Sequence, residues 1–149
     1  MRRIVGCVFQ SLDGVMQAPG SPIEDPTGGF LWGGWQFAFS DEVADAVVGR
    51  QCAPPFAMLL GRRTYDIFAS YWPYVEGDAA RLGEVFTQAD KYVLTHSDAP
   101  LAWENSHRLG SLDDLAALKQ SEGPELRIWG SSQLYPLLLG AGLLDRLIL

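Results

Sequence analysis

The chain alternates short apolar runs with amphipathic or polar segments. The apolar runs are bounded by turn residues and contain many β-branched and large aliphatic side chains, as is typical of strands buried on both faces. Strands are predicted over residues 3–10, 56–60, 91–95, 125–129 and 145–149. Because helical patterns lie between these runs, the alternation indicates an α/β fold.

Two of the intervening helices have clear start signals. Ser40, followed by two acidic residues and an apolar stripe, predicts an N-cap and a helix to about residue 51. Ser111 and Asp114, three residues apart, form a pattern that resembles a capping box, with Asp in place of the usual Glu. This pattern predicts a helix that ends before the Gly-Pro pair at 123–124. Shorter helices are predicted over residues 64–69, 81–86 and 132–139. Pro136 in the last one indicates a helix that starts later than residue 132 or is bent.

Residues 13–39 form the longest segment without periodicity. They contain many Gly and Pro residues, and loops of this length in compact proteins are usually functional or disordered. The interleaved aromatic residues favour a functional loop. Trp32, Trp35 and Phe37 are suited either to stacking on a flat ring or to covering the edge of the sheet. No repeat or linker divides the chain, which predicts a single domain over residues 1–149.

Composition narrows the possible partners. The chain has 149 residues, 48% of them hydrophobic, and is long enough to bury a full core. Its formal net charge of −7 argues against nucleic acid or an anionic membrane as the main partner. The N-terminal apolar run is too short for a signal sequence, and no stretch is long enough to span a bilayer. Cys7 and Cys52 show neither zinc-site nor disulfide spacing, so a reduced cytoplasmic protein without a metal is expected.

Three short segments carry the candidate chemistry. They are 11–14 (Ser-Leu-Asp-Gly), 61–64 (Gly-Arg-Arg-Thr) and 130–135 (Gly-Ser-Ser-Gln-Leu-Tyr), and each begins where a predicted strand ends. Open α/β sheets bind ligands at this end of their strands. Glycine lets the backbone approach a phosphate, arginine binds it with two donors, and the serines of the third segment suit a pyrophosphate. Together the segments predict a phosphorylated dinucleotide; separately, each also fits an ordinary polar turn or a serine cap.

These motifs and their neighbours carry a family resemblance. The residues concerned are Ser11–Met16, Leu59–Tyr65, Tyr92–Thr95, Ile128–Tyr135 and Gly142–Asp145. Over nearly its whole length the chain resembles the dihydrofolate reductase-like family, and most closely the reductase domain of the riboflavin-biosynthesis deaminase-reductase. The resemblance implies a three-layer fold with a central, mostly parallel sheet flanked by helices. It also implies NADPH as cofactor and a reducible heterocycle beside the nicotinamide.

The same resemblance suggests roles for individual residues. It implies that Arg62 faces the adenosine 2′-phosphate and selects NADPH over NADH, and that residues 15–17 line the nicotinamide pocket. Ser131 replaces a glycine that the family commonly has, which crowds the approach to the pyrophosphate. The predicted cofactor-binding residues are Val15, Met16, Gly61, Arg62, Arg63, Thr64, Leu94, Thr95, Gly130, Ser131, Ser132, Gln133, Leu134 and Tyr135.

The catalytic assignment rests on the family pattern alone. Dihydrofolate reductases carry a carboxylate on the helix before the Gly-Arg strand, and counting back from Gly61 makes Asp45 the first candidate and Asp13 the second. Acidic residues in a first helical turn also simply complement the helix dipole. Cations are few in the first half of the chain, which favours a pteridine- or pyrimidine-like substrate without a ribose phosphate. A non-catalytic NADPH-binding or regulatory module and a structural protein that binds no dinucleotide are the alternatives.

The end of the chain departs from the family pattern. Family members normally continue with two more strands after the segment that matches Leu143–Leu149, so the last strand pair is expected to be missing. An apolar strand at an open edge invites pairing with another chain. Truncation and a homodimer that covers this edge are both compatible with the sequence.

Overall fold

The computed structural model describes all residues from 1 to 149. The chain divides into two compact units: Met1–Cys7 with Pro54–Ile148, and Val8–Ala53 with Leu149. The prediction of a single domain over residues 1–149 stays a prediction.

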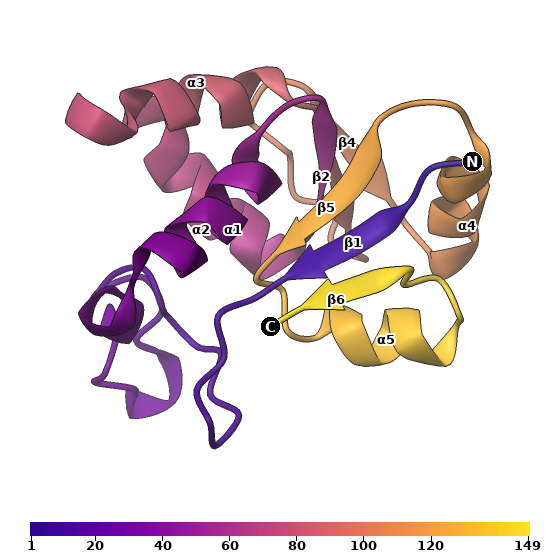
Figure 1. Ribbon diagram of the computed structural model, residues 1–149. Helices are drawn as coiled ribbons and strands as arrows, with labels where there is room; N and C mark the ends of the chain where they lie inside the picture. Colours follow the sequence, from indigo (N-terminus) through magenta and orange to yellow (C-terminus); the bar gives the residue numbers. More distant parts are fainter. The chain divides into compact units, whose positions relative to one another are not determined.

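The larger unit is built on a six-stranded sheet in which every neighbouring pair is parallel (Figure 1). The spatial order is β4-β3-β2-β5-β1-β6. The strands are β1 Ile4–Cys7, β2 Phe56–Gly61, β3 Lys91–Leu94, β4 Ser106–Leu109, β5 Glu125–Trp129 and β6 Arg146–Ile148. This sheet confirms the predicted α/β fold, and all five predicted strands are present in shortened or nearly unchanged form. β6 is an edge strand, because β1 is its only neighbour in the sheet, and its Leu147 is 40% exposed. The homodimer that would cover this edge stays a prediction.

Helices cover both faces of this sheet. The helices of the larger unit are α2 Arg62–Tyr71, α3 Ala80–Gln88, α4 Leu112–Gln120 and α5 Leu134–Gly140, with 3₁₀ turns η3 Trp72–Tyr74 and η4 Gly77–Ala79. Parallel neighbours need crossover connections, which are almost always right-handed. The crossover with α2 and α3 runs from β2 towards β4, whereas those with α4 and α5 run towards β6. The two pairs of helices therefore lie on opposite faces of the sheet (Figure 1).

The core is centred on β2, in which residues 56–60 are all buried. On one face, the Phe56 ring packs edge-on against Trp129 of β5, with ring centroids 5.0 Å apart. Phe86 of α3 joins both rings and lies 4.7 Å from Trp72. Burial of such large aromatic side chains is the main stabilising contribution at this face.

The smaller unit contains the long irregular segment expected from the sequence. Its elements are η1 Thr27–Gly29, η2 Trp35–Phe39 and α1 Glu42–Cys52. The Gln17 side-chain amide donates to the carbonyls of Asp25 and Thr27, both at 2.9 Å, and the Gln17 carbonyl accepts from the Trp35 indole at 3.0 Å. These side-chain hydrogen bonds satisfy backbone carbonyls that lie outside any α-helix or strand.

Some local predictions were wrong. Asp41, not Ser40, caps α1, because its carboxylate accepts the Ala44 N–H at 2.8 Å. The predicted helix itself is present as α1, and its apolar stripe contains no buried residue; Val43 is 72% exposed. Strand β4 was not predicted, and α2 begins two residues earlier than expected. Helix α5 does start late, at Leu134, which places Pro136 in the first turn, where its missing N–H costs nothing.

None of the helices is both long enough and apolar enough to cross a membrane.

Candidate functional site

The candidate site lies where the direction of the chain connections changes. β2 and β5 are neighbours, but the chain leaves β2 towards β3 and leaves β5 towards β6. Helices α2 and α5, which follow these strands, therefore diverge on opposite faces. Open α/β sheets bind ligands outside the carboxyl ends of their strands at such a point. The register pairs Met58 with Arg127, so Gly61 and Gly130, each three residues further on, lie level at this point.

Two of the predicted motifs are joined directly to each other here. The Ser131 hydroxyl accepts the backbone N–H of Gly61 at 2.8 Å, and the Thr64 hydroxyl accepts the backbone N–H of Ser131 at 3.0 Å. A Cβ atom on Gly130 would lie 3.4 Å from the Thr64 methyl group, and one on Gly61 would lie 3.4 Å from the Ser131 hydroxyl. The two turns therefore lie in van der Waals contact, and the positive φ of Gly130, 68°, favours glycine at that position.

Ser131 has a left-handed backbone, with φ 56°, directly after Gly130, with φ 68°. Only glycine adopts this conformation without strain, which explains why a second glycine suits the position. The Ser131 carbonyl accepts the Leu134 N–H at 2.8 Å and so starts α5. Ser132 and Gln133 are exposed on the turn, whereas Leu134 is buried.

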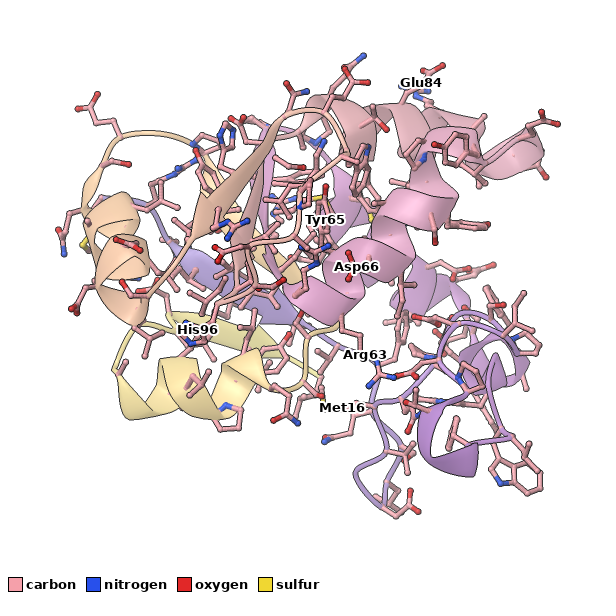
Figure 2. All side chains as sticks on the ribbon, turned by 180° about the vertical axis from the view of Figure 1, so that it is seen from behind. Met16, Arg63, Tyr65, Asp66, Glu84 and His96 are labelled. Carbon is pink, nitrogen blue, oxygen red and sulfur yellow. The ribbon has the colours of Figure 1, made fainter.

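The two arginines of the Gly-Arg-Arg-Thr motif have different surroundings. Arg62 donates from Nε to both carboxylate oxygens of Asp66, at 2.9 and 3.0 Å, one turn along α2. Its other nitrogens donate to the carbonyls of Ala99 at 2.9 Å and Pro100 at 3.4 Å. The hydrogen bond to Asp66 raises the pKa of the Arg62 guanidinium, with burial opposing it. Arg63 is exposed and projects from α2 in a different direction from Asp66 (Figure 2).

The end of β3 lies beside the same turn, because the register pairs Leu94 with Gly61. Thr95, 8% exposed, accepts the Ser97 N–H on its hydroxyl at 3.0 Å and donates its own N–H to the Leu109 carbonyl. His96, labelled in Figure 2, is exposed. The predicted residues that follow β2, β3 and β5 are therefore brought together at the carboxyl ends of these strands.

Tyr135 is buried beneath β1. A Cβ atom on Gly6 would overlap the Tyr135 ring and lie 3.0 Å from its hydroxyl, so glycine at this position makes room for the ring. The hydroxyl is buried and has no hydrogen-bond partner, and burial raises the pKa of Tyr135 above its ordinary value. Burial likewise raises the pKa of the half-buried Cys7 thiol next along β1.

The remaining predicted residues belong to the smaller unit. The Asp13 carboxylate accepts the Ser11 hydroxyl at 2.5 Å, and that hydroxyl also accepts the Val15 N–H at 2.9 Å. The Asp45 carboxylate on α1 accepts the Ser40 hydroxyl at 2.7 Å. Both carboxylates are exposed, and Val15 and Met16 are half-buried. The catalytic roles of Asp45 and Asp13 and the cofactor contacts of Val15 and Met16 stay predictions.

Sequence reasoning did not find two side chains next to the site. Asp66 follows Arg62 by four residues on a helix, and this spacing was a readable signal for an ion pair. Arg108 lies on β4 and donates to Asp98 at 2.8 Å and to the Ala99 carbonyl at 3.1 Å. No pattern in the sequence pointed to Arg108, because β4 itself was not predicted.

Comparisons with known proteins identify the family and the fold of the chain. The family model described as the RibD C-terminal domain matches residues 2–149. None of the curated proteins matches the chain significantly. Among solved structures, a dihydrofolate reductase from Enterococcus faecalis complexed with NADP(H) and RAB-propyl matches with a TM-score of 0.52 and 16% identity. The match covers 93% of this chain but 65% of that enzyme, and at this identity it shows the fold.

Proposed function

The chain belongs to the RibD C-terminal domain family, which has the dihydrofolate reductase-like fold, and from this premise we propose that it is an NADPH-dependent reductase. Its proposed substrate is a pteridine- or pyrimidine-like heterocycle, as in riboflavin biosynthesis or folate reduction. The observation that carries the proposal is the pair of hydrogen bonds that joins Gly61, Thr64 and Ser131 at the diverging ends of β2 and β5.

The residues at this edge fit the phosphates of a dinucleotide. The first N–H groups of the ten-residue helix α2 have no acceptor within the helix and carry the positive end of its dipole. Arg62 and Arg63 begin this helix, and the exposed Ser132 offers a hydroxyl and a backbone N–H on the opposing turn. In a protein of net charge −7, such a local group of donors is suited to a bound anion.

In the proposed reaction, bound NADPH supplies the hydride. The protein contributes rigid placement, because Thr64 and the Ser131 hydroxyl tie the two phosphate-binding turns to each other. The reduced ring also takes up a proton, for which Asp45 and Asp13 are the proposed donors. Their roles are separable by measuring turnover of Asp45→Asn and Asp13→Asn, since loss of the donor lowers kcat and leaves NADPH affinity intact.

Titration with NADPH, followed by cofactor fluorescence, tests the proposal. Thr64→Val removes the hydroxyl that accepts the Ser131 N–H and is expected to weaken NADPH binding by roughly tenfold, the effect of one lost hydrogen bond. Ser70→Ala is the matched control: Ser70 is exposed at the other end of α2 and bonds only the Ile67 carbonyl. Absence of NADPH binding by the wild type would overturn the proposal.

Turnover separates the reductase from the alternative of a non-catalytic NADPH-binding or regulatory module. Oxidation of NADPH is followed by its absorbance in the presence of a panel of oxidised pteridines and aminouracils. The reductase predicts oxidation with at least one of these compounds, whereas the regulatory module predicts tight binding with no oxidation by any.

A further inference from the structure

Arg62 is already engaged by other groups of this protein. All three of its guanidinium nitrogens donate hydrogen bonds, to the Asp66 carboxylate and to the carbonyls of Ala99 and Pro100. The carboxylate is an anion held at 2.9 Å from Nε, so it neutralises the charge that a phosphate would use. Arg62 can therefore select NADPH only in competition with the Asp66 carboxylate.

The loop that Arg62 contacts is held from a second side. The Ala99 carbonyl accepts from Arg62 and also from Arg108 of β4, at 2.9 and 3.1 Å. Arg108 also pairs with the Asp98 carboxylate at 2.8 Å. Two arginines from different elements therefore fix residues 98–100, and this loop keeps the Arg62 side chain beside Asp66.

The charges of the two ion pairs at Arg62 and Arg108 cancel. Arg62 and Arg108 contribute two positive charges, and Asp66 and Asp98 contribute two negative charges, each within hydrogen-bond distance of its arginine. The Asp66 carboxylate offsets the charge of Arg62 and repels a phosphate that approaches this guanidinium. A ribose hydroxyl at the same place carries no charge and is not repelled.

We propose that Asp66 determines cofactor specificity by competing with the 2′-phosphate of NADPH for Arg62, so that the preference for NADPH over NADH is small. This inference rests on the proposed function, because it requires that a dinucleotide bind at this edge. Asp66 acts through Arg62 and does not touch the reacting atoms. Removing its charge strengthens binding of NADPH and leaves binding of NADH unchanged.

The test compares Asp66→Asn with the wild type by calorimetric titration of NADPH and NADH. Asparagine keeps an oxygen that accepts from Arg62 Nε but removes the charge, and the ratio of the two affinities is expected to rise about three- to tenfold in favour of NADPH. Asp66→Glu keeps the charge and is expected to keep the wild-type ratio. Asp113→Asn, an exposed carboxylate on α4, is the charge-matched control and should change neither affinity.

Fragments isolate the contribution of the 2′-phosphate. Adenosine 2′,5′-bisphosphate and adenosine 5′-monophosphate differ only in that group, and only the former should bind Asp66→Asn more tightly than it binds wild type. Because Asp66 is about half exposed, with 53% side-chain accessibility, the gain should shrink at high salt.

The outcomes distinguish the two proposals. Absence of binding by NADPH, NADH and both fragments overturns the proposed function, and this inference with it. Binding with an unchanged or lowered NADPH preference in Asp66→Asn overturns only the competition, and a lowered preference would mean that Asp66 orients Arg62 towards the phosphate.

Discussion

Ser131 and Thr64, 67 residues apart in the chain, are joined by a hydrogen bond from the Ser131 N–H to the Thr64 hydroxyl. With the bond from the Gly61 N–H to the Ser131 hydroxyl, it makes the turn after β5 and the first turn of α2 a single structure. A disturbance of either turn is therefore transmitted to the other, and substitutions at Ser131 measure how the two are balanced.

Ser131 combines a strained backbone with a useful side chain. Ser131→Ala keeps the left-handed φ of 56° and removes the acceptor of the Gly61 N–H, so it is expected to destabilise the protein by about 1 kcal/mol. Ser131→Gly loses the same acceptor but relieves strain of about 1 kcal/mol, so its stability should stay near that of the wild type. Urea unfolding of the two variants checks this order, and equal stability of the alanine and glycine variants would contradict it.

Gly6 leaves room for the Tyr135 ring below β1. Gly6→Ala places a methyl group into that ring and 3.1 Å from Leu147, and is expected to destabilise the protein by about 2 kcal/mol. Gly49→Ala on α1 is the control, because a Cβ atom there meets nothing within 4 Å and alanine favours helix. Thermal unfolding compares the variants; a Gly6→Ala protein as stable as the wild type would show that Tyr135 does not pack there.

Asp145 ties the start of β6 to β1 and α4. Its carboxylate accepts hydrogen bonds from the Ile4 N–H, at 2.7 Å, and from the buried Lys119 ammonium. Burial alone would raise the pKa of Asp145, but these hydrogen bonds outweigh burial and hold the pKa below its ordinary value of 3.8. Its stabilising contribution is complete above pH 4 and is lost as pH falls through the lowered pKa. Asp145→Asn should cost about 2 kcal/mol at pH 7 and clearly less at pH 2. Equal costs in urea unfolding at the two pH values would contradict this linkage.

Lys91 is fully buried on β3, where its ammonium donates to the carbonyls of Phe86 and Thr87 and lies over the Trp103 ring. Burial lowers its pKa from 10.5 to about 8, against the attraction of Glu104 and another nearby acid. The unfolded chain therefore binds more protons than the folded one between these values, and stability rises with pH. Between pH 7 and 9.5 the rise should be about 2 kcal/mol.

Lys91→Met lacks this titration, so the stability difference between wild type and variant should move by that amount over the same interval. Urea unfolding at several pH values gives the free energy of unfolding of each protein. Subtracting the two values removes the contribution of the tyrosines, which both proteins share. A difference independent of pH would contradict the lowered pKa.

The sequence predicted the elements whose pattern follows from burial. Residues 56–60 of β2 are apolar because both faces of the strand are covered, and this is visible as a continuous run. In contrast, β4 contains His107 and Arg108, both exposed, and is held as a strand by pairing with β3. A strand that depends on its neighbour has no local signature. The cap of α1 was misplaced by one residue because Ser40 and Asp41 are equally good caps.

The candidate site was predictable in part for a similar reason. The glycines at 61 and 130 end apolar runs, so their position at strand ends could be read from the sequence. Their adjacency could not, because it depends on β2 and β5 being neighbours in the sheet, although β3 and β4 lie between them in the chain. The contacts of Arg62 with residues 99 and 100 depend on the path of a loop that has no periodic pattern.

The strand order also constrains how the protein is made. Of the six strands of this sheet β1 is synthesised first, yet its two neighbours are β5 and β6, and Ile4 pairs with Leu126, 122 residues later. β1 therefore leaves the ribosome with both edges unpaired, and they stay unpaired until β5 and β6 have been synthesised. Contacts of such long sequence separation slow folding and expose an apolar segment to chaperones and to aggregation. Within this sheet, β5 and β6 complete the pairing of β1.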